Sequence, residues 1–261
     1  MSSRSFYVST RIQYTDCTLM SNELHIHSFN LVIFDLDGVI INITDCLKRA
    51  LVDGIKKYAL AANPDEILIE LADLIEKLQA TPVPKTILNA KELLDVAYLN
   101  VPDITILKKV QIATYIYSQF KKYKEENALL YPRVEEFLRI LAKRKKIAML
   151  TNNRKSSALK TIKKFHLEPY FKEEYVYGFD ETGKLKPEPD GLLKILYDMR
   201  VKANRAIFIG DMVTDVIAGN RAGIRTICVQ SGLSKKLELE RENPYLIVRE
   251  LQDLFAILDL D

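Results

Sequence analysis

Two aspartates, Asp35 and Asp37, stand one residue apart directly after a short apolar run, in the sequence FDLDGV (34–39). If that run is a strand, side chains two residues apart point to the same side, so both carboxylates face one place. Gly38 lets the backbone turn sharply out of the strand. Carboxylates at the carboxyl end of a parallel strand lie where open α/β sheets bind ligands. Considered alone, a strand that simply ends in acidic turn residues explains the pair at least as well.

Three further polar groups follow other apolar runs of the chain. Thr151 and Asn152 begin a strand-to-helix turn, where backbone N–H groups and a helix N-terminus can hold an anion. Lys186 stands in the sequence KPEP, in which the prolines stiffen the backbone and can hold the ammonium at a set point. Asp211 and Asp215 come close together if a helix begins near residue 212. Each group alone is ordinary turn, loop or cap chemistry, but four groups in this order, each at a predicted strand end, indicate one shared site.

The elements that must position these groups are predicted from hydrophobic periodicity. Short apolar runs predict buried strands, and the stretches between them have the period of helices. This alternation favours a parallel sheet with helices on its faces, which is an α/β, Rossmann-like fold. We expect strands at 31–34, 146–150, 175–177, 206–209, 226–229 and 245–248, and helices at 134–142, 157–165, 191–199, 213–222 and 251–258.

The chain is expected to have three parts. Residues 31–41 and 128–261 contain the predicted strands and form the core domain. Residues 42–127 show long amphipathic patterns broken by prolines, without a convincing strand, and predict an inserted α-helical cap domain of about four helices. Residues 1–30 alternate loosely between apolar and polar types and predict an extension with a β-hairpin or edge strand.

Composition excludes several classes of function. Of 261 residues, 48% are hydrophobic and 28% charged, which is typical of a folded globular protein. Lys and Arg number 38 against 35 Asp and Glu, a net charge of +3 that argues against electrostatic binding of nucleic acid. No apolar run approaches the roughly 20 residues of a membrane span, and no secretory signal is evident, so the expected location is the cytoplasm. The chain also has no GxxxxGK[ST] or GxGxxG sequence, so neither an ATP P-loop nor a dinucleotide site is predicted.

A few other side chains have chemistry that the four groups do not use. His25 and His27 could ligate a metal from one strand face, although a surface strand explains them better. Arg49, Lys48 and the pair Asn153-Arg154 are plausible substrate contacts, but solvation at the surface explains each of them at least as well.

The order of the four groups resembles that of the haloacid dehalogenase superfamily of phosphotransferases, whose four motifs are all matched. The resemblance covers residues 31–41 and 128–261, and the helical insertion after the first motif is similar to the first type of cap in that family. Two features depart from the family pattern. Relatives close to phosphoglycolate phosphatase usually have Asp-Ser where this chain has Asn42-Ile43, and residues 1–30 have no counterpart in the common family pattern.

The resemblance implies a role for each group. Asp35 corresponds to the nucleophile and Asp37 to the general acid and base, while Thr151 and Lys186 correspond to the residues that stabilise the phosphate. It further implies Mg²⁺ as cofactor, held by Asp35, Asp211, Asp215 and the backbone carbonyl of Asp37, and phosphate or substrate contacts from Gly38, Asn152 and Asn153. Physical chemistry supports a cation here, because carboxylates that face a phosphate dianion repel it unless a divalent ion screens them.

We therefore expect a Mg²⁺-dependent phosphatase that hydrolyses a small phosphate monoester, phosphoglycolate-like or a sugar phosphate, through an aspartyl-phosphate. The expected partner is this small molecule, with no nucleic acid and no membrane. Two alternatives stay open: a sugar-phosphate mutase of the β-phosphoglucomutase type, and a non-catalytic phosphate-binding regulator. Dehalogenation is disfavoured because the relatives that perform it lack the second aspartate, which Asp37 supplies. The oligomeric state is not predicted.

Overall fold

The computed structural model describes residues 28–60, 63 and 106–258. Residues 1–27 of the predicted N-terminal extension, with His25 and His27, and residues 61–62 and 64–105 of the predicted cap lie outside the described residues. The strands are β1 (Leu31–Phe34), β2 (Ile41–Asn42), β3 (Leu129–Leu130), β4 (Lys146–Leu150), β5 (Val176–Tyr177), β6 (Ala206–Gly210), β7 (Arg225–Val229) and β8 (Leu246–Val248). The helices are α2 (Thr44–Tyr58), α5 (Ile106–Asn127), α6 (Val134–Leu141), α7 (Lys155–Lys164), α8 (Phe179–Thr182), α9 (Asp190–Met199), α10 (Val213–Ala222), α11 (Lys236–Arg241) and α12 (Leu254–Ile257).

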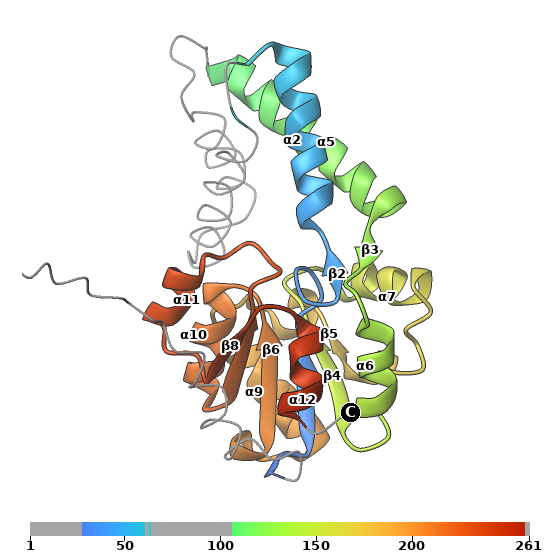
Figure 1. Ribbon diagram of the computed structural model, residues 1–261, viewed down its shortest axis with the longest axis vertical. Coiled ribbons are helices and arrows are strands. Elements are labelled where there is room, and N and C mark those ends of the chain that lie inside the picture. Colours follow the sequence, from blue (N-terminus) through green and yellow to red (C-terminus); the bar gives the residue numbers. More distant parts are fainter. Residues whose placement is uncertain (1–27, 61–62, 64–105, 259–261) are drawn as a thin grey trace, which may run out of the picture.

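Six of the strands form one parallel sheet in the order β5-β4-β1-β6-β7-β8 (Figure 1). β1 lies inside it, with Leu31 level with Lys146 of β4 on one side and with Ala206 of β6 on the other. All four residues of β1 are buried, as is typical of a parallel strand covered on both faces. The predicted α/β fold is confirmed.

Successive residues of β1 enter two different layers of the core. Val32 and Phe34 pack with apolar residues of α6, α7 and α12 on one face of the sheet. Leu31 and Ile33 pack with residues of α9 and α10 on the other face. The Phe34 ring meets Phe137 of α6 edge to face at 6.2 Å between centroids. Burial of such a side chain stabilises the fold by about 1.5–3 kcal/mol, so the carboxyl end of β1 is firmly placed.

The predicted insertion is represented by its two ends. α2 and α5 lie side by side and project from the region of β2 (Figure 1). They pack closely, since a Cβ added at Gly54 would come within 2.4 Å of Ile116, and the rings of Tyr58 and Tyr115 meet edge to face. At the base of this pair, β2 and β3 form a short antiparallel ribbon in which Asn42 pairs with Leu129. The expectation of no strand from residue 42 onward was therefore wrong at Asn42, because a two-residue ladder leaves no periodic pattern.

The predicted helix 251–258 was too long. Residues Leu251–Asp253 form a 3-10 turn and only Leu254–Ile257 are α-helical. The Asp253 carboxylate accepts the backbone N–H groups of Arg249 and Glu250 at 3.0 and 3.1 Å, which stabilises the tight turn in place of a helical start. The short helices α8 and α11 were not predicted, because four and six residues are too few to show helical period. Among the described helices, none combines the length and the apolar character that crossing a membrane requires.

Candidate active site

Asp35 and Asp37 lie on a tight loop at the carboxyl end of β1. The backbone N–H of Asp35 still donates to Ile209 of β6 at 2.9 Å, which continues the sheet by one residue. The loop then closes on itself, because the N–H of Gly38 donates to the carbonyl of Ile41 at 2.9 Å. Gly38 has φ of 88°, a conformation that side-chain-bearing residues rarely adopt. The sharp turn that the sequence predicted at Gly38 is therefore present.

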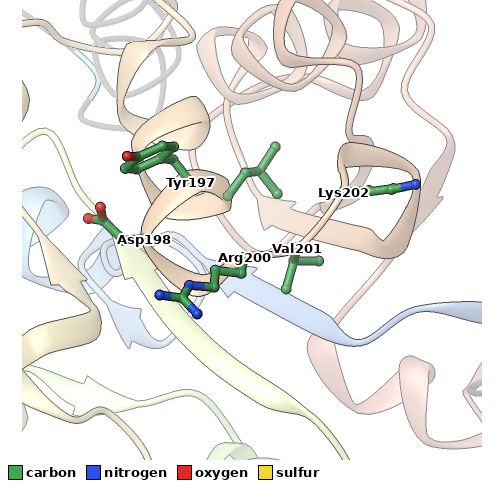
Figure 2. A pocket seen from close by; sticks show the side chains of 6 residues that line it. Tyr197, Asp198, Arg200, Val201 and Lys202 are labelled. Atoms are coloured by element: carbon green, nitrogen blue, oxygen red, sulfur yellow. The ribbon is translucent and has the colours of Figure 1, made fainter.

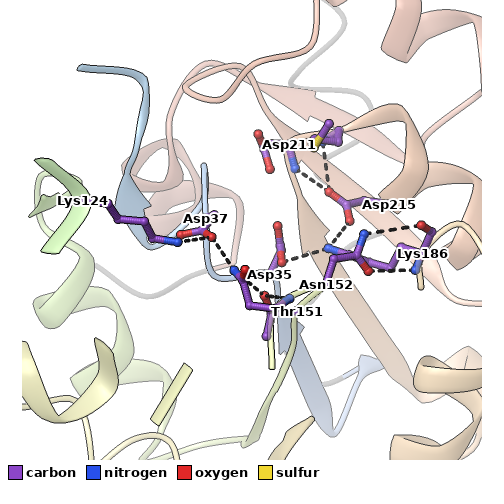
Figure 3. Close-up of polar contacts among 10 residues, drawn as sticks. Asp35, Asp37, Lys124, Thr151, Asn152, Lys186, Asp211 and Asp215 are labelled. Atoms are coloured by element: carbon purple, nitrogen blue, oxygen red, sulfur yellow. Dashed lines mark hydrogen bonds and ion pairs between the residues drawn. The ribbon is translucent and has the colours of Figure 1, made fainter. Parts of the chain in front are cut away.

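Three buried aspartates meet above the strand ends. One carboxylate oxygen from each of Asp35, Asp211 and Asp215 lies within 4.8 Å of the others (Figure 3). Asp215, in the first turn of α10, accepts the N–H groups of Asp211 and Met212 at 3.0 Å each through Oδ2. These bonds cap the start of α10 and fix the loop that carries Asp211. The sequence prediction of a helix beginning near residue 212 is confirmed, with α10 starting at Val213.

Glycines allow backbone to approach two of these carboxylates. A Cβ added at Gly38 or Gly232 would stand 2.2 or 1.8 Å from Asp211 Oδ2, and one added at Gly210 would stand 2.4 Å from Asp215. The N–H of Leu233, next to Gly232, donates to Asp211 Oδ2 at 3.2 Å. The structure thus places Gly38 against Asp211, while its predicted contact to phosphate stays a prediction.

Lys186 stands between two of the three aspartates. Its Nζ lies 2.8 Å from Asp35 Oδ1 and 2.6 Å from Asp215 Oδ1, and its side chain is only 4% exposed. Burial alone would lower the pKa of this ammonium, but the neighbouring carboxylates of Asp215 and Asp35 outweigh burial and raise it. Lys186 is therefore a fixed positive charge in the centre of the site.

Asn152 holds the backbone of Lys186 from two sides. Its Oδ1 accepts the Lys186 N–H at 2.9 Å, and its Nδ2 donates to the Lys186 carbonyl at 3.4 Å. The phosphate contact expected of Asn152 stays a prediction. What the structure shows is a side chain whose amide joins the turn after β4 to the loop that carries Lys186 (Figure 3).

Thr151 and Asn153 are joined to each other and to Asp37 by hydrogen bonds. Thr151 Oγ1 accepts the backbone N–H of Asn153 at 3.1 Å and its Nδ2 at 3.4 Å. The same Nδ2 donates to Asp37 Oδ2 at 2.7 Å. Lys124 of α5 approaches from the other side, with Nζ 2.5 Å from Asp37 Oδ2 (Figure 3). Lys124 was not predicted, because no motif surrounds it in the sequence.

The charges of the site suit a bound cation. Burial, followed by the nearby charge of Asp215, raises the pKa of Asp35 to about 7, even though Lys186 lowers it. Burial and the charges of Asp215 and Asp35 raise the pKa of Asp211 well above its ordinary value. Asp211 Oδ1 is buried and has no hydrogen-bond partner among the described residues. A buried carboxylate oxygen without a hydrogen-bond partner is rare and calls for an explanation. Together with the carboxylates of Asp35 and Asp215, it forms a set of oxygen ligands that a hard divalent cation fits.

A hollow elsewhere on the molecule contains none of these residues. It lies at the end of α9 (Figure 2). Lys146, the first residue of β4, donates to the carbonyl of Met199 at this end of α9, at 3.0 Å. This is the amino end of the strands, opposite to the end that carries Asp35. The hollow is lined by Leu196, Tyr197, Asp198, Arg200, Val201 and Lys202.

The buried carboxylate cluster and Lys186 thus lie together at the carboxyl edge of a parallel sheet, where open α/β sheets bind their ligands. Residues 32–229 match the family described as haloacid dehalogenase-like hydrolase, and the chain belongs to that family. The family predicted from the four motifs is therefore confirmed, as is the prediction of an enzyme of the phosphoric monoester hydrolase class.

Curated relatives are similar over most of the chain. A phosphoglycolate phosphatase of Pseudomonas savastanoi is 27% identical over 238 residues, which are 88% of this chain and 80% of that protein. A putative pyrophosphatase PpaX of Caldanaerobacter subterraneus is 25% identical over 230 residues, 87% of this chain and 93% of that protein. Among solved structures, a predicted phosphoglycolate phosphatase from Haemophilus somnus has a TM-score of 0.66 at 21% identity, covering 88% of this chain and 98% of the other. The structural likeness supports the shared fold.

Proposed function

We propose that this chain is a Mg²⁺-dependent phosphatase that hydrolyses a small phosphate monoester through an aspartyl-phosphate on Asp35. The observation that carries the proposal is the placement of Asp35. It is buried at the end of β1, within 4.8 Å of two further carboxylates, 2.8 Å from the Lys186 ammonium and two residues from Asp37. A carboxylate held in this way is presented as a nucleophile, with positive charge and a proton-transfer group beside it.

The reaction would proceed in two displacements. In the first, an Asp35 carboxylate oxygen attacks phosphorus, the bond to the leaving oxygen breaks, and Asp37 gives that oxygen a proton. In the second, Asp37 takes a proton from water and the water oxygen attacks phosphorus. The bond between phosphorus and the Asp35 oxygen then breaks, which restores the Asp35 carboxylate and frees inorganic phosphate. Both steps need a second carboxyl group, next to the nucleophile, that transfers the protons while the nucleophile is bonded to phosphorus. Asp37, two residues from Asp35, would be this group.

Positive charge and hydrogen bonds would hold the transferring phosphoryl group. Lys186 is fixed by Asn152 and by its two carboxylate partners. Its ammonium and the Thr151 hydroxyl would both bind the phosphoryl oxygens. Mg²⁺ held by Asp35, Asp211, Asp215 and the Asp37 carbonyl would supply the charge that screens the phosphate from the carboxylates. Fixed donors of this kind act without reorganising during the reaction.

The proposed substrate is a small anionic phosphate compound or a sugar phosphate, taken from solution in the cytoplasm. The names of the relatives, phosphoglycolate phosphatase and pyrophosphatase, refer to small molecules that carry phosphate and further negative charge. We expect the helical insertion that begins directly after the Asp35 loop to cover this edge of the sheet. Such a cover admits small molecules and excludes bulk water from the reacting phosphoryl group.

A panel of phosphate compounds assayed with Mg²⁺ is expected to show hydrolysis of at least one small member with release of inorganic phosphate. The panel contains 2-phosphoglycolate, inorganic pyrophosphate, several sugar phosphates including β-glucose 1-phosphate, and a phosphopeptide. Isomerisation of β-glucose 1-phosphate without phosphate release would establish the mutase in place of the phosphatase. Binding of phosphate compounds with no turnover of any of them would establish a regulator, and turnover of the phosphopeptide alone would contradict a small substrate.

Mg²⁺ is also expected to raise the melting temperature, because it would relieve the crowding of buried carboxylates in the folded state. A ligand that binds only the folded state at 100 times its Kd stabilises that state by about 2.7 kcal/mol. Thermal melts in EDTA and in excess Mg²⁺ measure the effect. The matched control is Asp211→Asn, in which the shift should shrink or vanish. Identical melts in the two buffers, with activity that resists EDTA, would contradict the metal site.

A further inference from the structure

The carboxylate of Asp37 is held asymmetrically. Its Oδ2 accepts two bonds, from Lys124 Nζ at 2.5 Å and from Asn153 Nδ2 at 2.7 Å. Its Oδ1 is buried and has no hydrogen-bond partner in the described ranges 28–60, 63 and 106–258. One oxygen is therefore used to orient the group, and the other is available for a new bond.

Lys124 comes from a part of the chain remote from the sheet. It is 87 residues from Asp37 in sequence and lies in the last turn of α5, at the end of the predicted insertion. The side chains of Lys124 and Asp37 are only 22% and 18% exposed, so the pair is partly shielded from solvent. In Figure 3 the lysine reaches from α5 across to Asp37, and it is the one labelled residue there that comes from α5.

The backbone around Lys124 is fixed by both neighbouring helices. The carbonyl of Tyr123 accepts the Cys46 thiol of α2 at 3.5 Å, and the Tyr123 hydroxyl donates to Asp53 of α2. The carbonyl of Glu125 accepts Lys164 Nζ of α7 at 2.5 Å. The carbonyls of the last four residues of a helix lack helical partners, so the bond from Lys164 satisfies one of them, at Glu125. Together with the contacts of Tyr123 to α2, it fixes the direction of the end of α5. Lys124 is thus presented from a defined position rather than from a mobile surface.

We propose that Lys124 is a positioning residue that, with Asn153, holds Asp37 Oδ2 so that Oδ1 faces the leaving group. This inference rests on the proposed function, since it assigns Asp37 the proton transfers of the two displacements. It links the placement of α5 to proton transfer, because a displaced α5 would withdraw one of the two donors that orient Asp37. Errors of about 1 Å in the placement of a catalytic group can reduce rates by roughly 100-fold.

The test compares Lys124→Met and Lys124→Arg with wild type in single-turnover phosphorylation. Two substrates are used: the alkyl phosphate that wild type hydrolyses fastest in the panel above, and p-nitrophenyl phosphate. The nitrophenolate leaves well without a proton, so its release does not depend on a correctly oriented Asp37. We expect Lys124→Met to slow phosphorylation by the alkyl ester about 10- to 100-fold, to change the nitrophenol burst by less than about threefold, and to be largely restored by Arg. Asp37→Asn should show the same pattern with a larger loss.

Lys122→Met, an exposed lysine two residues away on α5, is the matched control and should leave both rates unchanged. Equal losses for the two substrates in Lys124→Met would overturn the inference in favour of a general structural role. So would unchanged rates with both substrates, or a loss that Arg does not restore. A wild-type chain that turns over no member of the panel would overturn the proposed function and this inference together, whereas an active wild type with any of the preceding results overturns this inference alone.

Discussion

Asp35→Asn is expected to lower kcat by at least about 10³-fold, because the amide cannot form the covalent intermediate that divides the reaction into two displacements. The substitution changes one oxygen to nitrogen and keeps the size and shape of the side chain. It should leave the sheet intact, since the Asp35 side chain takes no part in the backbone bonds that join β1 to β4 and β6. The measurement is steady-state turnover of the best substrate, with circular dichroism of the same samples.

The melting temperature separates loss of the nucleophile from loss of the fold. Burial raises the pKa of Asp35, which means that its charged form is poorly tolerated in the folded state. A neutral amide removes that penalty, while Lys186 keeps its partner Asp215, so we expect a melting temperature close to or above that of wild type. Asp190→Asn, which breaks an exposed ion pair with Lys184, is the control and should keep full activity. Retention of more than a tenth of wild-type kcat by Asp35→Asn would exclude Asp35 as the nucleophile.

The sheet and the meeting of the acidic residues were predictable from the sequence. Parallel strands covered on both faces appear as continuous apolar runs, and β1, β4 and β6 are such runs. The carboxyl ends of parallel strands share one edge of the sheet, which predicts that the groups after them gather there. Asp35 and Asp211 lie close together because β1 and β6 are neighbours in the sheet, an order that the sequence did not predict. The prediction failed where elements are too short for a period, as in the ribbon formed by Asn42 and Leu129.

The contacts that hold the site were not predictable in the same way. Lys124 has no local signal, because a lysine at the end of an amphipathic helix is most often a solvated residue. Its role depends on the position of the end of α5, which places Lys124 beside Asp37 although the two residues are 87 positions apart in sequence. Asn152 was predicted as a phosphate contact from its place after a strand, yet its bonds to Lys186 depend on the path of a loop 34 residues later. Both cases concern pairings between distant loops, which periodicity and motif order do not encode.

Lys186→Met is expected to have a large effect on stability as well as on activity. The ammonium is the partner of both Asp35 and Asp215, and all three side chains are buried. Removing one partner of a buried ion pair leaves an uncompensated charge and typically costs about 3–5 kcal/mol. For a protein of this size that corresponds to a fall in melting temperature of about 6–20 °C. Turnover should also fall by about 10²- to 10³-fold, because a fixed charge that stabilises the transferring phosphoryl group is lost.

A second substitution shows whether the lost stability comes from the uncompensated carboxylates. In Asp35→Asn/Lys186→Met one of those carboxylates is neutral, so the double variant should melt at a higher temperature than Lys186→Met alone. This non-additivity is expected only of residues that interact directly. Lys184→Met, which removes an exposed lysine from the same loop, is the matched control and should change stability by less than about 0.5 kcal/mol. If Lys186→Met melts at the temperature of Lys184→Met, Lys186 does not compensate the buried carboxylates in solution, and the electrostatic arrangement proposed for the site is wrong.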